Sequence, residues 1–449
     1  MNRDDLLRYD QRVPRYTSYP TAADFSPAVD AACYGDWLAA LPAGEEISLY
    51  LHIPFCREMC WFCGCHTTVA RGDRAVDAYL TLIEREIDLL ADSLGPDHPV
   101  VHIHWGGGTP TILGPDGISR LAGRLHDRFS VTSDAQFAVE VDPRIVTNEI
   151  AMAMAEAGVN RASLGVQDFD AKVQRAINRI QPFEMTAQVV DWLRGAGVEA
   201  LNIDLIYGLP EQTIAGITAT VDAALKLEPQ RIALYGYAHV PWMKRHQKLI
   251  DEAALPNTAQ RVALCEAATA GFLEHSYVAI GLDHLALPTD NLAVAAREGT
   301  LRRNFQGYTT EPAKVLLGLG TSAIGTLPQG YVQNAARTTD YRTAIEGGDF
   351  ATARGIAVTD DDRLRRRLIE RLMCDFEVDL AGLCGGADEA TAEFAEDLAA
   401  LAPLEAQGVV QVDGNRVRVM PEARLLLRVV CAVFDRRLPL HAERHAVAV

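Results

Sequence analysis

The 449-residue sequence is notable first for what it lacks. It has no uninterrupted apolar run of about 18 residues, so no membrane span is expected. Three of its first five residues are charged, with no apolar segment behind them, which argues against a signal peptide. Nine cysteines are too few for a disulfide scaffold, so we expect a cytoplasmic protein with reduced thiols. Basic residues are also in deficit: the net charge of −18 disfavours nucleic acid and anionic membranes as partners.

Four of the nine cysteines lie within ten residues, directly after a strand-like apolar segment. They are Cys56, Cys60, Cys63 and Cys65. Three thiolates with the spacing of the first three can hold three irons of a 4Fe-4S cubane and leave the fourth iron open to a ligand. A zinc site normally needs a second ligand pair about 12 to 20 residues further along, and only His66 is close enough to complete a compact site. An iron-sulfur cluster is therefore favoured over zinc or a disulfide.

Short strand-like segments alternate with amphipathic helices through the first half of the chain. The first helix is the clearest, because Val76, Tyr79, Ile83 and Leu90 recur at helical spacing. Alternating strands and helices predict a parallel sheet, here in a (β/α)6 pattern. The expected strands are residues 48–53, 101–105, 137–141, 161–166, 201–206 and 231–235.

The strands themselves alternate between polar and apolar residues, whereas fully buried parallel strands usually read as continuous apolar runs. Side chains two residues apart share one face of a strand, so one face of each strand is polar. Six such faces in succession predict a partial barrel with a polar interior. The paired residues are Tyr50 with His52, His102 with His104, Glu140 with Asp142, Ser163 with Gln167, Asn202 with Asp204, and Tyr235 with Tyr237.

The Cys-x3-Cys-x2-Cys spacing resembles the signature of radical S-adenosylmethionine (SAM) enzymes. Further segments resemble one family among them, the oxygen-independent coproporphyrinogen III oxidases, and they cover most of the chain. These segments are PRYTSYP (14–20), LHIPFC (51–56), GGGTPT (106–111), VQDF (166–169), NIDLIYGLP (202–210), YAH (237–239) and RNFQGY (303–308).

The resemblance implies a set of cofactor-binding residues. It makes Cys56, Cys60 and Cys63 the cluster ligands and leaves Cys65 outside the set. It also implies two SAM molecules. The positions matching the cluster-bound molecule are Tyr50, Gly107, Glu140 and Ile324. Those matching the second molecule are Phe62, Gly108, Thr109, Gln167, Arg179, Asp204 and Ala238.

The resemblance further implies the reaction. A 5′-deoxyadenosyl radical formed from SAM takes a hydrogen from a propionate side chain of coproporphyrinogen III, and loss of carbon dioxide and an electron leaves a vinyl group. Two such conversions give protoporphyrinogen IX, with no side chain needed as a base. A low-potential electron donor is required. Because the substrate carries about four negative charges, we expect arginines to bind it, and the candidates are Arg15, Arg303 and the adjacent Arg302.

Two related functions remain as alternatives: a radical SAM haem chaperone and a haem-degrading radical SAM methyltransferase. The resemblance implies that the chaperones lack both the cysteine at position 65 and the arm of residues 14–20. Both features are present in this sequence, which favours the oxidase over the chaperone.

We expect an α/β protein in three parts that acts as a monomer: an irregular N-terminal arm (1–45), a partial (β/α)6 TIM-like radical SAM barrel with an extension (46–345), and a smaller, mainly helical C-terminal domain (346–449). The last part resembles a winged helix, with helices at 364–376, 390–401 and 422–434 and a hairpin around Gly414. The acidic balance disfavours DNA binding, so a lid or packing role is expected.

Overall fold

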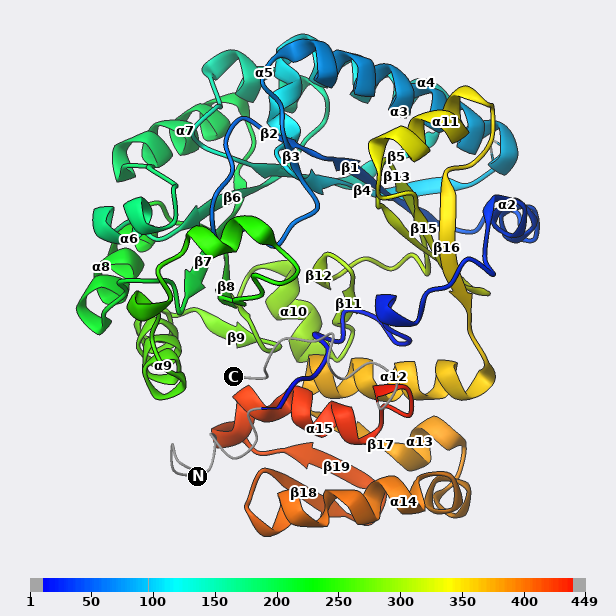
Figure 1. Ribbon diagram of the computed structural model, residues 1–449. Helices are drawn as coiled ribbons and strands as arrows, with labels where there is room; N and C mark the ends of the chain where they lie inside the picture. Colours follow the sequence, from blue (N-terminus) through cyan, green and yellow to red (C-terminus); the bar gives the residue numbers. More distant parts are fainter. Residues whose placement is uncertain (1–10, 96, 439–449) are drawn as a thin grey trace.

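The computed structural model describes residues 11–95 and 97–438, so the first five residues lie outside it. Its central element is a curved sheet of 12 strands (Figure 1), in the order β16-β15-β14-β13-β1-β4-β5-β6-β7-β8-β10-β9. No helix in the described ranges is long and apolar enough to cross a membrane.

The six predicted strands form the middle of this sheet, and every neighbouring pair among them is parallel. The predicted α/β class and partial barrel are therefore confirmed. The third strand starts earlier than expected, because its polar first half still pairs with the beginning of β4. The strands are β1 (Ile47–Ile53), β4 (Pro99–Gly107), β5 (Ser130–Val141), β6 (Arg161–Gln167), β7 (Ala200–Tyr207) and β8 (Arg231–Gly236).

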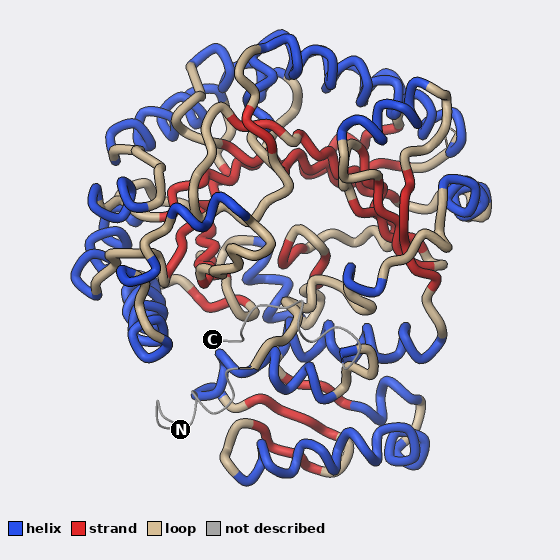
Figure 2. The backbone as a smooth tube through the Cα atoms, viewed as in Figure 1, coloured by secondary structure: helices blue, strands red, loops and turns tan. Residues whose placement is uncertain are grey.

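Helices cover the outside of the sheet, as Figures 1 and 2 show. The predicted apolar stripe of α3 (Asp73–Leu94) is buried, which confirms that helix. Burial of such stripes against the apolar faces of the strands supplies most of the driving force for this layer. The other outer helices are α4 (Gly114–Arg128), α5 (Asn148–Glu156), α6 (Ala171–Ala176), α7 (Phe183–Ala196), α8 (Ile214–Leu225) and α9 (Thr258–Glu274).

Six further strands extend the sheet beyond the predicted barrel. On one side β13 is parallel to β1, and three antiparallel strands follow it. On the other side β10 pairs antiparallel with β8, and β9 pairs antiparallel with β10. These strands are too short for a clear alternation of polar and apolar residues. They are β9 (Val278–Ile280), β10 (His284–Ala286), β13 (Val315–Leu319), β14 (Ile324–Leu327), β15 (Gly330–Asn334) and β16 (Thr352–Ala357).

Short elements connect this framework. Two helices lie beside the extension, a small hairpin precedes β13, and short strands and 3-10 turns shape the loops. They are α10 (Asn291–Glu298), α11 (Thr338–Glu346), β2 (Phe55–Cys56), β3 (Thr68–Val69), β11 (Arg302–Asn304), β12 (Gly307–Thr309), η2 (Pro110–Leu113), η3 (Arg245–Leu249) and η4 (Glu252–Ala254).

The N-terminal arm is more ordered than expected. It contains a turn, η1 (Ala22–Asp24), and a helix, α2 (Ala31–Ala39), which begins where the Asp30 side chain accepts a hydrogen bond from the Cys33 N–H at 3.0 Å. The helix packs against α3 and β16. Val13, Tyr16 and Tyr19, which precede the turn and the helix, instead pack into the apolar core of the C-terminal part. There the Tyr16 hydroxyl donates a hydrogen bond to Asp435 at 3.0 Å. The arm therefore links both parts of the molecule.

The C-terminal part contains the expected hairpin and the helices expected at 364–376 and 390–401, together with one extra strand that completes a three-stranded sheet. The helix expected at 422–434 is instead a 3-10 turn followed by a shorter α-helix. The elements from α12 onward share an apolar core of their own. The predicted boundary at residue 346 is too early, because β16 follows it in the chain but still belongs to the main sheet. The elements are α12 (Asp360–Asp375), β17 (Glu377–Asp379), α13 (Leu380–Cys384), α14 (Ala387–Ala406), β18 (Val410–Asp413), β19 (Arg416–Val419), η5 (Pro421–Leu426) and α15 (Leu427–Val433).

Candidate active site

The four clustered cysteines lie in the loop between β1 and α3, at the carboxyl end of the sheet. Short strands β2 and β3 pair parallel at its base, with Cys56 opposite Val69. The loop faces a cavity of about 150 Å³, which all four cysteines line. We call this space the cysteine cavity. Active sites of parallel barrels occur at this end of the strands, so the loop lies where the sequence predicted.

Donor groups surround two of the sulfur atoms. The Thr67 hydroxyl lies 3.2 Å from the Cys56 Sγ, and the Thr109 hydroxyl donates to it at 3.4 Å. Arg144 and Arg179 donate to the Cys60 Sγ at 3.4 and 3.5 Å. The two threonine hydrogen bonds oppose the effect of burial on Cys56, but burial is the larger effect and raises the pKa of this thiol above its ordinary value.

Cys63 and Cys65 lie close together. The Cys65 N–H donates to the Cys63 Sγ at 3.4 Å, and a side-chain hydrogen bond with Cys65 lowers the pKa of Cys63 to about 6. Within the described ranges, no three His, Cys, Asp or Glu side chains converge on one metal position. A cubane needs no such convergence, because each cysteine binds a different iron. The cysteine geometry fits the group, while the choice of three ligands among the four stays a prediction.

The glycine-rich turn after β4 packs closely against the cysteine loop and β5. Gly107 has φ of +106°, and a Cβ there would lie 2.4 Å from the His52 ring. A Cβ on Gly108 would lie 2.6 Å from the Phe55 carbonyl oxygen. A side chain at either position would therefore displace backbone or ring atoms. Both glycines also line the cysteine cavity, so the turn is a tight structural feature and a cavity wall.

Two partly buried carboxyl groups, Glu140 and Asp204, line the cysteine cavity, and their surroundings differ. Glu140 accepts from the Gly107 N–H at 3.0 Å and lies 3.4 Å from the His104 Nε2. Burial alone would raise its pKa, but the His104 interaction and the Gly107 bond hold the pKa below its ordinary value. Burial raises the pKa of Asp204 to about 6, although it accepts from Ser163 at 3.1 Å and from Asn202 at 2.7 Å. The two groups therefore carry different charges near pH 6.

Two other predicted residues, Gln167 and Arg179, also line this cavity. Gln167 ends β6 with φ of +71°, a left-handed conformation that few non-glycine residues adopt. Arg179 is buried and donates to Asp142 at 3.1 Å and to the Gly165 carbonyl. Its Nε has no hydrogen-bond partner in the described structure. Arg179, predicted to contact the second SAM molecule, is therefore already paired through part of its guanidinium.

The remaining predicted cofactor residues lie in several places. Phe62 and Thr109 line the cysteine cavity, but Ala238 lines a neighbouring one. Tyr50 stacks on His104 and its hydroxyl lies 3.0 Å from the His52 Nδ1. Ile324 is on β14, beside Gly318, the β13 residue that pairs with Tyr50. The structure thus brings most, but not all, of the set into one space.

Two more cavities continue from the cysteine cavity. The interior cavity, of about 120 Å³, is lined by residues from the polar faces of the strands, including His102, His104 and Asn202, which confirms the predicted polar interior. Asp204 lines both this cavity and the cysteine cavity, while Tyr235 lines both this cavity and the next. The three spaces therefore form a series through the barrel.

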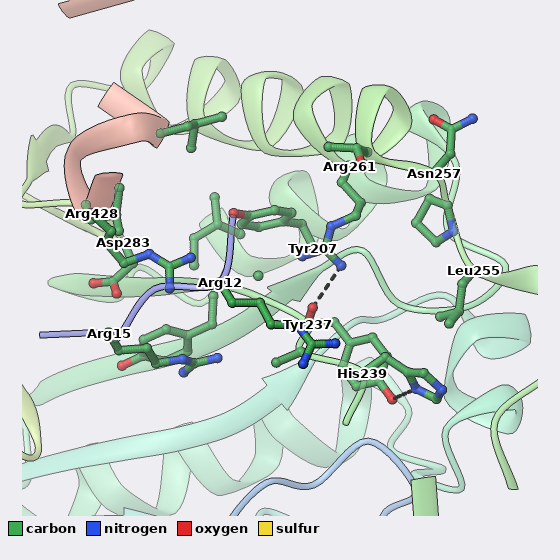
Figure 3. Close-up of a pocket in the computed structure, with 18 of the residues that line it drawn as sticks. Arg12, Arg15, Tyr207, Tyr237, His239, Leu255, Asn257, Arg261, Asp283 and Arg428 are labelled. Carbon is green, nitrogen blue, oxygen red and sulfur yellow. Dashed lines mark hydrogen bonds between the residues drawn. The ribbon is translucent and has the colours of Figure 1, made fainter. Parts of the chain in front are cut away.

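The third space, the arginine cavity, has a volume of about 320 Å³ and lies where β7, β8, α9, the N-terminal arm and α15 meet (Figure 3). Tyrosines form part of its wall, and Arg261 donates to the Tyr237 carbonyl at 2.8 Å. Five arginines line it: Arg12, Arg15, Arg261, Arg303 and Arg428.

Two of these five, Arg15 and Arg303, were predicted as substrate ligands. Their neighbour Arg302 instead donates to the Pro312 carbonyl at 3.1 Å. The other three were missed, because Arg12, Arg261 and Arg428 lie in an arm and two helices with no motif around them.

One carboxylate accompanies the arginines. The Asp283 Oδ2 lies 3.8 Å from the Arg303 Nη2 and its Oδ1 lies 2.7 Å from the His284 Nδ1. Burial alone would raise the pKa of Asp283, but the Arg303 guanidinium and the His284 hydrogen bond hold it well below its ordinary value. Burial lowers the pKa of Arg428 to about 10, so this arginine stays charged at neutral pH. Asp283 thus offsets part of the positive charge, and the cavity remains cationic.

The comparisons with known proteins agree with this site. The Radical SAM superfamily model matches residues 50–224, and the HemN C-terminal domain model matches residues 358–426. The oxygen-independent coproporphyrinogen III oxidase of Bradyrhizobium diazoefficiens is 51% identical over 450 residues and covers 100% of both chains. That of Escherichia coli is 41% identical, over 96% of this chain and 94% of its own.

A solved structure of coproporphyrinogen III oxidase (HemN) from Escherichia coli, described as a radical SAM enzyme, matches with a TM-score of 0.90 and 40% identity. The match covers 97% of this chain and 98% of the other. Sequence and fold agree over nearly the full length, and the radical SAM match carries with it a 4Fe-4S cluster and SAM. The chain therefore belongs to the oxygen-independent coproporphyrinogen III oxidases of the radical SAM superfamily.

Proposed function

We propose that this protein oxidatively decarboxylates two propionate side chains of coproporphyrinogen III to vinyl groups and so produces protoporphyrinogen IX. The observation that carries this proposal is the series of three cavities. Asp204 joins the cysteine cavity to the interior cavity, and Tyr235 joins the interior cavity to the arginine cavity. A site for radical formation thus adjoins a cationic site suited to a polycarboxylate.

When bound, the cluster and SAM supply a 5′-deoxyadenosyl radical. At each propionate one hydrogen atom, one carbon dioxide and one electron leave, while one electron enters for each SAM cleaved. The chain's residues hold the reactants and exclude water, as in other enzymes where the cofactor supplies the reactivity. A titrating side chain is not required as a base, which suits a cavity whose carboxyl groups are already hydrogen-bonded.

Two SAM molecules are part of the proposal. The first would contact Glu140 and Gly107 together with Tyr50 and Ile324. Glu140 supports this role, because its depressed pKa keeps it ionised to accept from an ammonium or hydroxyl group. The second would contact Asp204, from which the wall continues toward the arginine cavity. Its other residues are Phe62, Gly108, Thr109, Gln167, Arg179 and Ala238.

The arginine cavity would hold the propionates of the substrate. Guanidinium groups bind carboxylates with two parallel hydrogen bonds and keep their charge at any relevant pH. Arg15 and Arg303 are neighbours, because the Arg303 Nη2 donates to the Arg15 carbonyl oxygen at 3.5 Å, and three further arginines line the same cavity. Tyrosine rings such as Tyr207 supply apolar surface for the tetrapyrrole. Local positive charge thus compensates for the net charge of −18, which would repel the substrate at long range.

Part of the arginine cavity comes from outside the barrel. Arg12 and Arg15 belong to the N-terminal arm, and Arg428 belongs to α15 of the C-terminal part. Both segments therefore contribute to the wall of the arginine cavity, which supports the predicted lid role. We place the protein in the cytoplasm as a monomer that receives electrons from a low-potential donor.

The test is an anaerobic incubation with coproporphyrinogen III, SAM and a chemical reductant, followed by mass spectrometry. Loss of two carbon dioxides per porphyrinogen and formation of 5′-deoxyadenosine are expected. Unchanged coproporphyrinogen combined with tight haem binding would favour a haem chaperone. Cleavage or methylation of added haem would favour a haem-degrading methyltransferase.

A further inference from the structure

A groove on the outer surface of the barrel is lined by four arginines and one acidic residue. It lies between α3 and α11, which pack against each other (Figure 1), and its volume is about 700 Å³. The arginines are Arg71, Arg74, Arg85 and Arg342, and the acidic residue is Glu346. We call this surface the basic groove. Such a concentration of positive charge is unexpected on a chain with a net charge of −18.

The arginines of the basic groove are exposed, and within the described ranges none of them forms an ion pair or a side-chain hydrogen bond. The adjoining face of α3, which meets α4, behaves differently, and Arg120 of α4 reaches Thr81 at the edge of the groove. There Glu84 and Asp88 pair with Arg120 and Arg124 of α4. Acidic residues do occur near the groove, but Asp73 pairs with Arg57 outside it. The groove therefore keeps its positive charge available to a partner.

The basic groove lies next to the cysteine loop. Val69 pairs with Cys56, and Arg71 follows Val69 by two residues. Paired strands lie about 5 Å apart, and two residues span at most about 7 Å, so Arg71 begins within roughly 12 Å of the first cluster cysteine. On the other side, the His66 Nε2 lies 2.7 Å from the Ala336 carbonyl, which joins the loop to the segment preceding α11. Both walls of the groove thus connect directly to the loop.

We propose that the basic groove docks an acidic, low-potential electron-carrier protein that reduces the cluster. This inference rests on the proposed function, because an electron carrier would bind beside the cysteine loop only if that loop holds a redox-active cluster. A carrier bound here would approach the exposed side of the loop, where residues 64–66 are accessible. The substrate cavity lies at the arm and α15, so reduction and substrate binding use separate surfaces.

The charge pattern favours a protein carrier over nucleic acid. A nucleic acid presents a long row of phosphates and would meet the repulsion of the acidic surface beyond the groove. An acidic protein of limited contact area needs only a local cationic patch, and complementary charge mainly accelerates its association.

The experiment uses the cluster-loaded full chain and a reduced plant-type [2Fe–2S] ferredoxin, an acidic carrier of low potential. In one variant, glutamate replaces all four arginines of the basic groove: R71E, R74E, R85E and R342E. In the control variant, glutamate replaces four exposed basic residues elsewhere on the surface: K226E, R297E, K314E and R367E. The two variants therefore change the net charge by the same amount. Stopped-flow bleaching of the cluster absorption reports reduction without involving any porphyrinogen.

The groove variant should lose at least about tenfold in the second-order rate of reduction by ferredoxin, because steering charges act chiefly on association. The control variant should keep a rate within about twofold of the wild type. Dithionite should reduce the cluster in all three proteins at equal rates. The wild-type rate with ferredoxin should fall as salt rises from about 0.02 to 0.3 M, since salt screens exposed charges.

Equal rates for the groove and control variants would overturn the proposal, as would a wild-type rate independent of salt. Preferential binding of duplex DNA by the groove arginines, in a fluorescence titration with the same variants, would also overturn it. If the glutamate variant loses iron, a variant with glutamine at the four positions replaces it, and an unchanged ferredoxin rate there is equally decisive. Failure of the proposed porphyrinogen reaction is seen separately, as reduced cluster without decarboxylated product.

Discussion

Replacement of the arginines at the arginine cavity should separate substrate binding from radical formation. Arg15 comes from the N-terminal arm and is exposed, while the Arg303 side chain is only 5% exposed and lies 4.3 Å from the ring centroid of Tyr308. We expect Arg15→Ala and Arg303→Ala to raise the KM for coproporphyrinogen III. Neither change should alter the iron content, because neither residue lines the cysteine cavity.

The two effects should differ in size. A hydrogen bond to a charged group contributes about 1.5 to 3 kcal/mol. Arg15 is solvated, so the lower figure applies and KM should rise about tenfold. Arg303 is buried, so the upper figure applies, and its loss also leaves Asp283 without its guanidinium partner. The bare carboxylate would then repel a propionate, so the increase in KM should exceed about 100-fold.

A second substitution tests that reasoning. In Arg303→Ala/Asp283→Asn, the repelling carboxylate is gone, so KM should fall back toward the value of Arg15→Ala. The assay is initial-rate kinetics under anaerobic conditions with saturating SAM and dithionite, together with iron analysis and thermal unfolding. Arg367→Ala, an exposed arginine of α12 outside the cavity, is the matched control and should behave as wild type.

An unchanged KM in both single variants would show that the substrate binds elsewhere. Equal losses of kcat and iron, without a change in KM, would mean that these arginines act only through folding. Failure of the Asp283 substitution to restore binding would refute the electrostatic explanation for Arg303 and leave loss of packing on Tyr308 as the cause.

Three further predictions concern the cofactors and the core. Cys56→Ser, or serine at either other proposed ligand, should abolish the 4Fe-4S absorption, whereas Cys65→Ser should retain it; equal iron loss in all four variants would refute the assignment. Glu140→Ala should suppress reductive SAM cleavage, while Asp204→Ala should leave the spectral change on SAM addition but reduce product; identical behaviour would argue against two sites. Burial raises the pKa of Glu86 to about 7, even though it accepts from the Gly320 N–H at 2.6 Å and from two side chains. The folded state therefore binds this proton more tightly than the unfolded chain, and the free energy of unfolding should fall by up to about 3 kcal/mol as pH rises from about 4.5 to 7. Glu86→Gln should remove that slope in urea titrations at pH 5 and 7, and a persistent slope would assign it to other groups.

Much of the barrel could be read from consecutive residues. The alternation of Tyr50 with His52 and of Asn202 with Asp204 is a local property of a strand, because side chains two apart share a face whatever the rest of the chain does. The same holds for the stripe on α3 and for the spacing of the cysteines. The short edge strands escaped prediction, since three residues such as those of β9 or β10 are too few to show a periodic pattern. They are strands only because β10 pairs with the edge of β8 and β9 pairs in turn with β10.

The residues of the arginine cavity are a different case. Arg12, Arg261 and Arg428 are separated by more than a hundred residues at each step and carry no shared motif. They meet because the arm packs into the core of the C-terminal part and α15 lies over the open side of the barrel. The four arginines of the basic groove likewise lie together only because α11 packs beside α3. The sequence alone determined the cluster loop and the polar faces of the strands, because both follow from local spacing; only long-range packing decided which charges face each other across a cavity or a groove.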